Sequence, residues 1–567
     1  MDVVTVLREL KSAVDAQIEA WKVAQGIIVS SYDSLITSIK GFISGYCDAK
    51  IIELKSKSGA EPPEEFIGII NNSLKSTKEI INEKDSVIGN YTYSGSNIMY
   101  FHHGIGNKVC EGAFNNCSML FAVYMPDLVA CTNAKKLFNG CSFLTSLTFP
   151  DGSLSAVTNA SYMFNGCSSL TSLTFPEGSL SAVTTIERLL TGCSSLTSVT
   201  FPEGSLYKVS NMHDAFNGCS KVTSITFPNG SLSGVKNVRS AFSFCKSLTS
   251  ITFPDGSLLS VDNAETMFYN CSSLTSLTFP DGSLSAVTNA SQMFYNCVKL
   301  TSLTFPDGSL SAVTNAYSVF SQCSKLTEIN GTINLANATE ISYFAYKSAI
   351  PETKLAEMRD TINWSIVKNA SGHFYGDKFV KTFSHPETIS LTTAKEMFRA
   401  SKMETIDIDL SNLTEVASYI FDSSKSLTSV TLHGGIGDVA SVEHLFADCT
   451  ALTTITGLSF KSVTCTSLNM FLNCTALTDC KYEGTLYMSG ISLSPCTNLS
   501  AESLYSWVSA LYDWKTNSEG KTTTSTSHVL TLSESQIESL RSYTGDNGES
   551  GESAYVLALE KGWDITL

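Results

Sequence analysis

The sequence predicts an α/β solenoid, a stack of short coils with a parallel β-sheet along one side. Three observations predict it: a fixed repeat, a strand-like alternation within each repeat, and a turn signal after that alternation. A cysteine recurs every 26 residues, and a period in this range is typical of solenoids whose repeats bury their apolar faces against their neighbours. The regularly spaced cysteines are Cys141, Cys167, Cys193, Cys219, Cys245, Cys271, Cys297 and Cys323.

One repeat shows how a coil is expected to form. Leu173 and Phe175 alternate with hydroxyl residues, which is the periodicity of a strand with one buried face. The Pro-Glu-Gly run at 176–178 then turns the chain. Residues 159–164 predict a short helical piece that packs inward, and Asn165-Gly166 ends it. Stacked strands of this kind give a parallel sheet with a rise of about 4.8 Å per coil.

Composition excludes several classes of protein. The 567-residue chain has a net charge of −16, so we expect no nucleic-acid binding, which needs a cationic surface. A hydrophobic fraction of 43 % is enough for a folded core. No run of 18 apolar residues predicts a membrane span. Charged residues interrupt the first 17 positions, so we expect no secretory signal.

The first 90 residues differ from the repeats. Their apolar residues fall mostly three and four positions apart, which predicts one or two long amphipathic helices. No coil covers this stripe locally, so we expect region 1–90 to form a homo-oligomer such as a trimer, or to attach to another protein. The predicted attachment face consists of Leu7, Leu10, Val14, Ile18, Trp21, Ile28, Tyr32, Leu35, Ile39 and Phe42.

The rest of the chain divides into four parts. We expect regular repeats in 91–345, irregular repeats or an insertion in 346–397, further repeats in 398–496, and a C-terminal α+β capping domain in 497–567. Within the last part, the Ser-Glu-Ser-Gln run that begins at Ser533 is a capping-box helix start. A solenoid needs such an end structure because its last coil is otherwise open.

The phrase MFNGCSSLTSLTF at 163–175 resembles the BspA-like leucine-rich repeat. The resemblance covers roughly residues 105–480. It implies a right-handed leucine-rich-repeat coil with a parallel β-sheet on one side. It also implies a surface adhesin or interaction module and not an enzyme.

The termini resemble a different group of proteins. A helical start without a signal and the ending LALEKGWDITL at 557–567 are similar to virion proteins of phages that infect gut bacteria. In those proteins such repeats decorate tail or capsid appendages. This resemblance implies a protein that folds in the host cytoplasm and is released by lysis.

The cysteine column is expected to be structural. Successive cysteines would lie about 4.8 Å apart along the stack, which exceeds the usual Cβ separation of about 3.8 Å in a disulfide. Buried thiols pack as small apolar groups, and no CxxC pair or adjacent histidine cluster indicates zinc. We therefore predict packing in preference to disulfides, and no metal or cofactor.

Alternation places a regular row of hydroxyl residues on the outer strand face, which is the first candidate ligand surface. It could present a repeating surface to a glycan or to ice. The alternative is that Thr favours strands and keeps an exposed sheet soluble. The row contains Ser172, Thr174, Ser198, Thr200, Ser224, Thr226, Ser250, Thr252, Ser276 and Thr278, and it extends to Ser146, Thr148, Ser302 and Thr304.

The turns carry a second column, of carboxylates. Neighbouring acids at coil spacing could hold divalent cations, but Asp is also a common turn residue whose exposed charges repel by only about 1 kcal/mol in water. The column consists of Asp151, Glu177, Glu203, Asp255, Asp281 and Asp307.

The expected helical piece varies while the rest of each repeat is nearly constant. A constant framework with one varied edge is how repeat proteins encode recognition, and neutral drift at exposed sites is the alternative. We call these positions the variable edge: Tyr162, Arg188, His213, Asp214, Arg239, Glu265, Gln292 and Tyr317.

No spacing indicates a nucleophile, base and acid that act together, so we expect a non-enzymatic protein. The best enzymatic alternative is the irregular segment 346–390, with His373 as its candidate residue. The main hypothesis is a virion appendage that binds other virion proteins through its N-terminal helices and a host-surface glycan or protein through the solenoid. The alternative is a cell-surface adhesin of a bacterium or protist.

Overall fold

A computed structural model describes residues 91–94, 98–101 and 110–567, except 119, 121, 125–127, 129, 150, 388, 462–464, 489, 514–527, 546–547 and 549. It divides into two compact units, residues 1–180 with 193–200 (unit 1) and residues 181–192 with 201–567 (unit 2). The predicted helices and attachment face of region 1–90 lie outside the described residues, so the oligomer stays a prediction.

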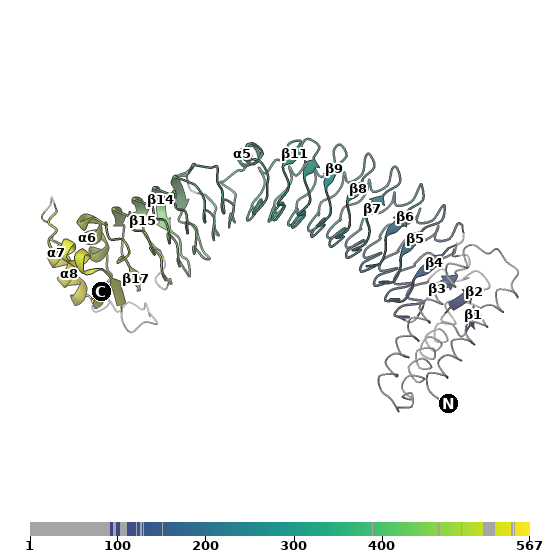
Figure 1. The fold of residues 1–567 in the computed structure, drawn as a ribbon, viewed down its shortest axis with the longest axis horizontal. Coiled ribbons are helices and arrows are strands. Elements are labelled where there is room, and N and C mark those ends of the chain that lie inside the picture. The colour runs from purple at the N-terminus through teal and green to yellow at the C-terminus, as the bar shows by residue number, and fades with distance from the viewer. Residues whose placement is uncertain are drawn as a thin grey trace, which may run out of the picture. The chain divides into compact units, whose positions relative to one another are not determined.

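Both units are built from coils that carry short parallel strands along one side (Figure 1). In unit 1, β1 (Tyr91–Ser94) and β2 (Ile98–Phe101) form an antiparallel pair, and β2 continues in parallel through β3 (Ala122–Tyr124) to β4 (Ser146–Thr148). The strands β5 (Ser172–Thr174) and β6 (Ser198–Thr200) form a further parallel pair.

Unit 2 continues with the same type of strand. Its parallel groups are β7 (Ser224–Thr226) with β8 (Ser250–Thr252), then β9 (Ser276–Thr278), β10 (Ser302–Thr304) and β11 (Glu328–Asn330). The register is exact at the repeat length, because Leu277 pairs with Leu303. The solenoid predicted from the cysteine spacing is therefore confirmed.

The core consists of columns of identical side chains. Phe242, Phe268, Phe294 and Phe320 are fully buried, and neighbouring ring centroids lie 5.3, 5.5 and 5.8 Å apart in stacked geometry. The phenylalanines that follow the strands meet this column edge-on; Phe253 does so against Phe242 at 6.1 Å. Stacked and edge-to-face pairs are both favourable aromatic contacts, so these coils share a continuous aromatic core, whereas Leu190 takes the equivalent buried position in an earlier coil.

The prediction of a short helical piece at residues 159–164 is wrong. The segment consists of tight turns, because Tyr162 has φ 60° and Gly166 has φ 76°. The Asn165 N–H closes a turn onto the Tyr162 carbonyl, whereas the Met163 carbonyl accepts from Phe138 in the neighbouring coil at 2.7 Å. Backbone groups of this segment therefore bond both within the coil and to the neighbouring coil, which satisfies them without a helix.

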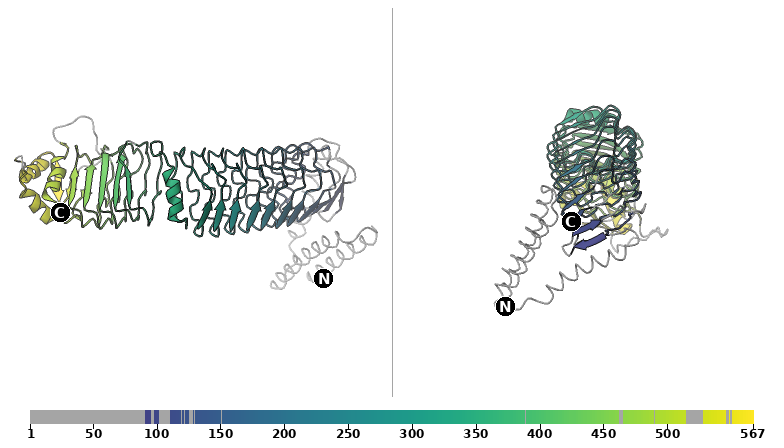
Figure 2. Two further views of the ribbon diagram at one scale, coloured as in Figure 1. Left: turned by 90° about the horizontal axis from the view of Figure 1, so that it is seen from above. Right: turned by 90° about the vertical axis from the view of Figure 1, so that its right-hand side faces the viewer.

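The irregular part of the chain forms coils of a modified type. The helix α5 (Glu352–Asp360) replaces part of one coil (Figure 2). A five-stranded parallel sheet follows, with β12 (Thr382–His385), β13 (Thr405–Leu410), β14 (Ser429–Ile436), β15 (Thr454–Leu458) and β16 (Asp479–Tyr482). The phenylalanine column continues here, since Phe374 stacks on Phe398 at 5.4 Å.

The C-terminal region is the α+β structure that the sequence predicts. It combines the parallel strands β17 (Ile491–Ser492), β18 (His528–Thr531) and β19 (Trp563–Thr566) with the helices α6 (Ala501–Ser509), α7 (Glu534–Arg541) and α8 (Gly551–Glu560). Ser533 and Gln536 form the predicted capping box.

A tryptophan of α6 covers the last ring of the phenylalanine column. The buried indole of Trp507 meets Phe471 edge-on at 6.0 Å, and its Nε1–H donates to the Cys480 carbonyl at 2.8 Å. The column therefore ends against a large side chain and not in water, which is the role expected of a capping element. No helix in the described part of the chain is long and apolar enough to cross a membrane.

Candidate binding surfaces

The cysteine column is buried, and its thiols also form hydrogen bonds that the sequence did not reveal. The Cys271 Sγ–H donates to the Phe242 carbonyl at 3.1 Å, and the same geometry recurs along the column. At the corresponding place in a later coil, Ser424 donates to the Phe398 carbonyl at 2.6 Å. Burial raises the pKa of the Cys245 thiol to about 12. The column therefore consists of protonated donors and not of reactive thiolates.

This hydrogen bond predicts the order of two substitutions. Replacing Cys271 with alanine removes the donor and leaves a small void, so the free energy of unfolding is expected to fall by about 1–2 kcal/mol. Cys271→Ser keeps a donor for the Phe242 carbonyl, as Ser424 does naturally, and is expected to cost less. Urea unfolding of the two variants checks this; an alanine variant more stable than the serine variant would show that packing alone matters.

The strand face is exposed as expected but chemically uniform. All ten Ser and Thr residues of the central row are exposed. The threonines that immediately precede these strands form hydrogen bonds between coils. Thr249 Oγ1 donates to the Thr223 carbonyl and Thr301 Oγ1 to the Thr275 carbonyl, both at 3.0 Å. Each of these strands exposes one Ser and one Thr on either side of a buried aliphatic residue, so this face has little with which to distinguish one ligand from another.

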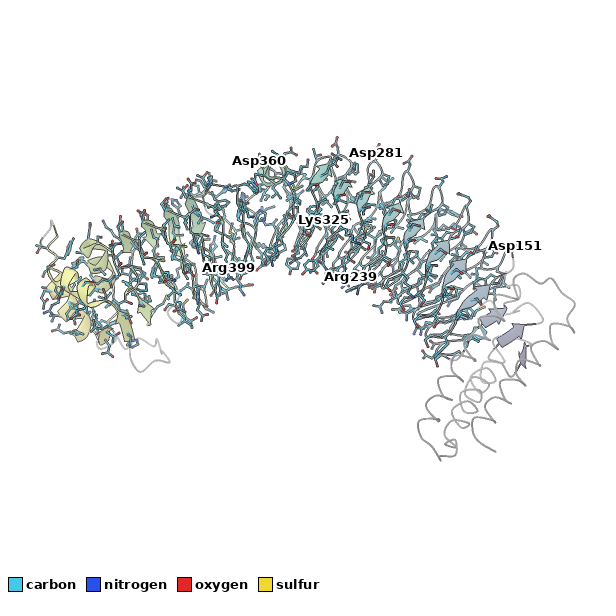
Figure 3. The ribbon with its side chains drawn as sticks, viewed as in Figure 1. Asp151, Arg239, Asp281, Lys325, Asp360 and Arg399 are labelled. Carbon is cyan, nitrogen blue, oxygen red and sulfur yellow. The ribbon has the colours of Figure 1, made fainter. Side chains whose placement is uncertain are left out.

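The turn carboxylates do not gather into a site. All six are exposed, and the described residues include no group of three or more His, Cys, Asp or Glu side chains placed to hold a metal ion. In Figure 3 Asp281 lies on the edge of the coils opposite Arg239 and Arg399. The acidic turns and the variable edge are thus two separate surfaces of unit 2.

The structure brings together several residues of the variable edge. Arg188 Nε and His213 Nε2 lie 3.0 and 3.3 Å from the same Asp214 oxygen. One coil further, Arg239 Nε lies 3.4 Å from Glu265 Oε2. These partners are 26 residues apart or adjacent in sequence, so the edge is a set of contacts between neighbouring coils.

The remaining variable positions are less closely connected. Tyr162, in unit 1, lies under the Lys136 ammonium at 5.9 Å. In unit 2, Tyr317 meets Tyr343 edge-on at 6.5 Å. Gln292 has φ 55°, so this position has a left-handed backbone although its residue is not glycine. Glycine adopts this conformation at lower cost.

Sequence reasoning missed a row of aromatic residues beside the variable edge. Tyr269 and Tyr295 stack at 5.0 Å with an interplanar angle of 9°, and Phe244 packs against Tyr269 at 5.4 Å. Phe244 is 40 % exposed. These residues follow the core phenylalanine of each coil by one or two positions, and this segment also varies between repeats. That variation was the signal that could have found them.

The same edge of unit 2 carries more aromatic residues in later coils. Tyr346 meets Tyr375 at 5.0 Å. The Arg399 guanidinium lies 5.7 Å from the Tyr375 ring and 4.9 Å from the Tyr419 ring, and Tyr419 stacks on His444 at 5.0 Å. Such cation–π contacts contribute about 0.5–1 kcal/mol each at exposed sites.

A hollow of about 240 Å³ lies between the variable edge and the aromatic row, and we call it the edge groove. Its base is made of small hydroxyl residues: Ser240 and Thr266 hydroxyls lie 2.6 Å apart, and Ser243 donates to the Thr266 carbonyl at 2.7 Å. One wall is polar and the other aromatic. The lining residues are Asn217, Arg239, Ser240, Ser243, Phe244, Glu265, Thr266, Tyr269 and Gln292.

A second hollow, of about 400 Å³, lies in the C-terminal region between β16 and α6. Its charged pair, Lys481 and Glu502, is about half exposed on each side. Its walls come from residues outside the repeated positions. We therefore place the candidate site at the edge groove, where variation within a constant framework and a hollow coincide.

His373, the candidate residue for an enzyme, is held in an aromatic cluster. Its Nδ1 lies 3.1 Å from the Ile341 carbonyl, and its ring contacts Phe374 at 4.8 Å and Trp364 at 5.8 Å. Burial lowers the pKa of this imidazole to about 4. The neutral ring donates to a backbone carbonyl and fills space between coils, which supports a structural role.

The lowered pKa of His373 predicts that the folded protein becomes less stable in acid. Between about pH 6.5 and 4 the unfolded chain binds a proton at His373 that the folded chain does not, so the free energy of unfolding falls as the pH falls through this window. The loss is expected to reach up to about 3 kcal/mol. Urea unfolding of wild type and His373→Asn at several pH values checks this; identical pH dependence of the two proteins would contradict it.

The comparisons with known proteins bear first on the family. The chain matches the BspA type leucine rich repeat region over residues 86–212, 134–257, 186–327, 238–371 and 368–500. It belongs to this family. The match covers most of the chain, and it confirms the BspA-like resemblance based on residues 163–175.

Solved structures similar to this chain are found at low identity and low TM-score. A protein from Bacteroides ovatus has 18 % identity and a TM-score of 0.26, with 73 % of this chain and 79 % of that chain covered. A cell surface protein from Faecalibacterium prausnitzii has 18 % identity and a TM-score of 0.27, with 71 % and 90 % covered. The pneumococcal vaccine antigen PcpA has 16 % identity and a TM-score of 0.29, with 62 % and 77 % covered.

No curated protein matches the chain. The matches reported above give no support to the phage virion appendage that the termini led us to expect. The chain is a BspA-type leucine-rich-repeat protein.

Proposed function

We propose that this BspA-type protein is a non-enzymatic adhesin of a cell surface, and that it binds its partner through the variable edge and aromatic row of unit 2. The family match supports a binding scaffold. The observation that carries the proposal is the edge groove, where residues that differ between otherwise repeated coils line one hollow.

The chemistry of the two exposed surfaces favours this edge over the strand face. The strand face repeats Ser and Thr, whereas the edge combines an ion pair, an amide and aromatic rings within three coils. Aromatic residues and arginine dominate the energetics of recognition because they bury large areas and also form polar contacts. Because the side chains differ between successive coils, a ligand can bind the edge in one position and orientation. The strand face repeats the same residues and does not define such a position.

Adhesion of the labelled full chain to bacterial and epithelial cells tests this proposal. The Phe244→Ala/Tyr269→Ala double variant is expected to lose most of the adhesion, while Thr252→Ala/Thr278→Ala, on the strand face, retains it. Equal adhesion of both variants would show that the edge is not the binding surface. A wild-type chain that adheres to none of the cells would contradict the adhesive function itself.

A further inference from the structure

We propose that the edge groove binds a neutral polysaccharide of pyranose rings whose chain runs along the stack of coils. This inference rests on the proposed binding function and names the ligand class. A pyranose ring has a rim of hydroxyl groups and two faces of C–H bonds, so it suits a groove with one polar and one aromatic wall.

The polar wall provides donors and acceptors with little net charge. Arg239 and Glu265 already form an ion pair, with 47 % and 29 % of their side chains exposed. The guanidinium keeps N–H donors and the carboxylate keeps lone pairs for hydroxyl groups. Gln292 adds an amide that both donates and accepts. Because the charges offset each other, this wall favours a hydroxylated neutral ligand over an ionic one.

The aromatic wall has an uncovered ring at one end. Phe244 packs against Tyr269 on one side. The preceding coil has Gly218 at the equivalent position, which carries no side chain to cover the other side. A phenylalanine that is 40 % exposed next to a bare glycine leaves an apolar surface for the C–H face of a sugar ring.

The spacing of the wall favours a sugar chain over an extended peptide. Successive coils advance by about 5 Å, as the stacked rings of Tyr269 and of Tyr295 beside the groove show. This is close to the advance of one ring along an extended pyranose chain, whereas a peptide strand advances about 3.3 Å per residue. The backbone amides of Ser240 and Phe244 donate to the carbonyls of Glu265 and Tyr269 at 2.8 Å. These amides are used between coils, so they do not offer the free ladder that binds a peptide as an added strand.

Affinity electrophoresis of the full chain tests the ligand class, in gels that contain dissolved starch, mannan, xylan or mixed-linkage β-glucan. At least one polymer is expected to retard the wild-type protein. Phe244→Ala should raise the dissociation constant at least tenfold. The control is Tyr207→Ala, which removes another exposed aromatic residue, 46 % accessible and outside the groove, and should leave retardation unchanged. A neutral ligand also predicts nearly equal retardation at low and high salt.

In the gels, three outcomes would overturn the inference: no retardation by any of the four polymers, retardation that survives Phe244→Ala, or retardation that high salt abolishes. Cells treated with periodate or trypsin separate this inference from the proposed function. Adhesion that trypsin abolishes and periodate spares would identify a protein ligand, and it would refute the polysaccharide while leaving the adhesin standing. Adhesion that only periodate abolishes supports both.

Discussion

Phe242→Ala is expected to lower the free energy of unfolding by about 3–5 kcal/mol, the usual cost of removing a fully buried aromatic ring. The ring is completely inaccessible and stacks between Phe216 at 5.5 Å and Phe268 at 5.3 Å. Its loss leaves a void between neighbouring coils, and the coils of a solenoid are stabilised mainly by contacts with their neighbours. Urea unfolding followed by circular dichroism measures the effect.

Phe244→Ala is the matched control, two residues along the same coil. Phe244 is 40 % exposed, and its truncation is expected to cost less than about 1 kcal/mol because water already reaches much of the ring. The contrast between the two positions tests the assignment of inward and outward side chains. Similar costs at both would show that the phenylalanine column is not the core.

Gly457→Ala is expected to be a severely disruptive small substitution in the described coils of β12–β16. A Cβ at Gly457 would lie 2.0 Å from the Leu432 carbonyl oxygen of the neighbouring strand, so the two backbones must separate. Gly457 also has φ 74°, where a side chain costs about 1–2 kcal/mol. We expect a total loss above about 4 kcal/mol, in the range reserved for severe backbone or core damage.

Gly256→Ala is the control that separates the steric clash at Gly457 from the cost of placing a side chain on a left-handed backbone. Gly256 has φ 76°, and a Cβ there would meet no atom within 4 Å. This variant should therefore lose only about 1–2 kcal/mol. Urea midpoints of the two variants give the difference directly. If both lost the same amount, the close approach of β14 and β15 at Gly457 would be refuted.

The sequence predicted the coil framework because its signals are local and repeated. The alternation around Leu173 gave the strand and its buried face, and the fixed spacing gave parallel stacking. The turns at 159–164 were mistaken for a helix because their hydrogen bonds go partly to the next coil, and no local pattern contains those partners. The bond from Cys271 to the Phe242 carbonyl was missed for the same reason, since the two residues are 29 positions apart.

The candidate site was predicted only in part. Arg239 and Glu265 were singled out because they vary within the repeat, and the structure pairs them. Phe244 and Tyr269 vary equally, but their relation to Arg239 depends on how the turns fold back in each coil. Left-handed backbone at Ser240 and Phe244 brings the two segments to one edge. That conformation is unusual for residues other than glycine and has no simple sequence signal.

The central claim is that the constant framework of the coils supports a variable edge that binds the ligand. It is tested most directly by replacing residues of this edge with those found at equivalent positions in other coils. The variant Arg239→Ser/Phe244→Gly/Glu265→Ser/Tyr269→Asn uses residues that occur at equivalent positions, as at Gly218, Asn217 and Ser291. Neighbouring coils already tolerate these residues, and such exchanges are usually compatible with repeat folds. Adhesion to cells and the urea midpoint are measured on the same protein. We predict that adhesion is lost while the midpoint stays near that of wild type; undiminished adhesion, or an unfolded variant, would contradict the account.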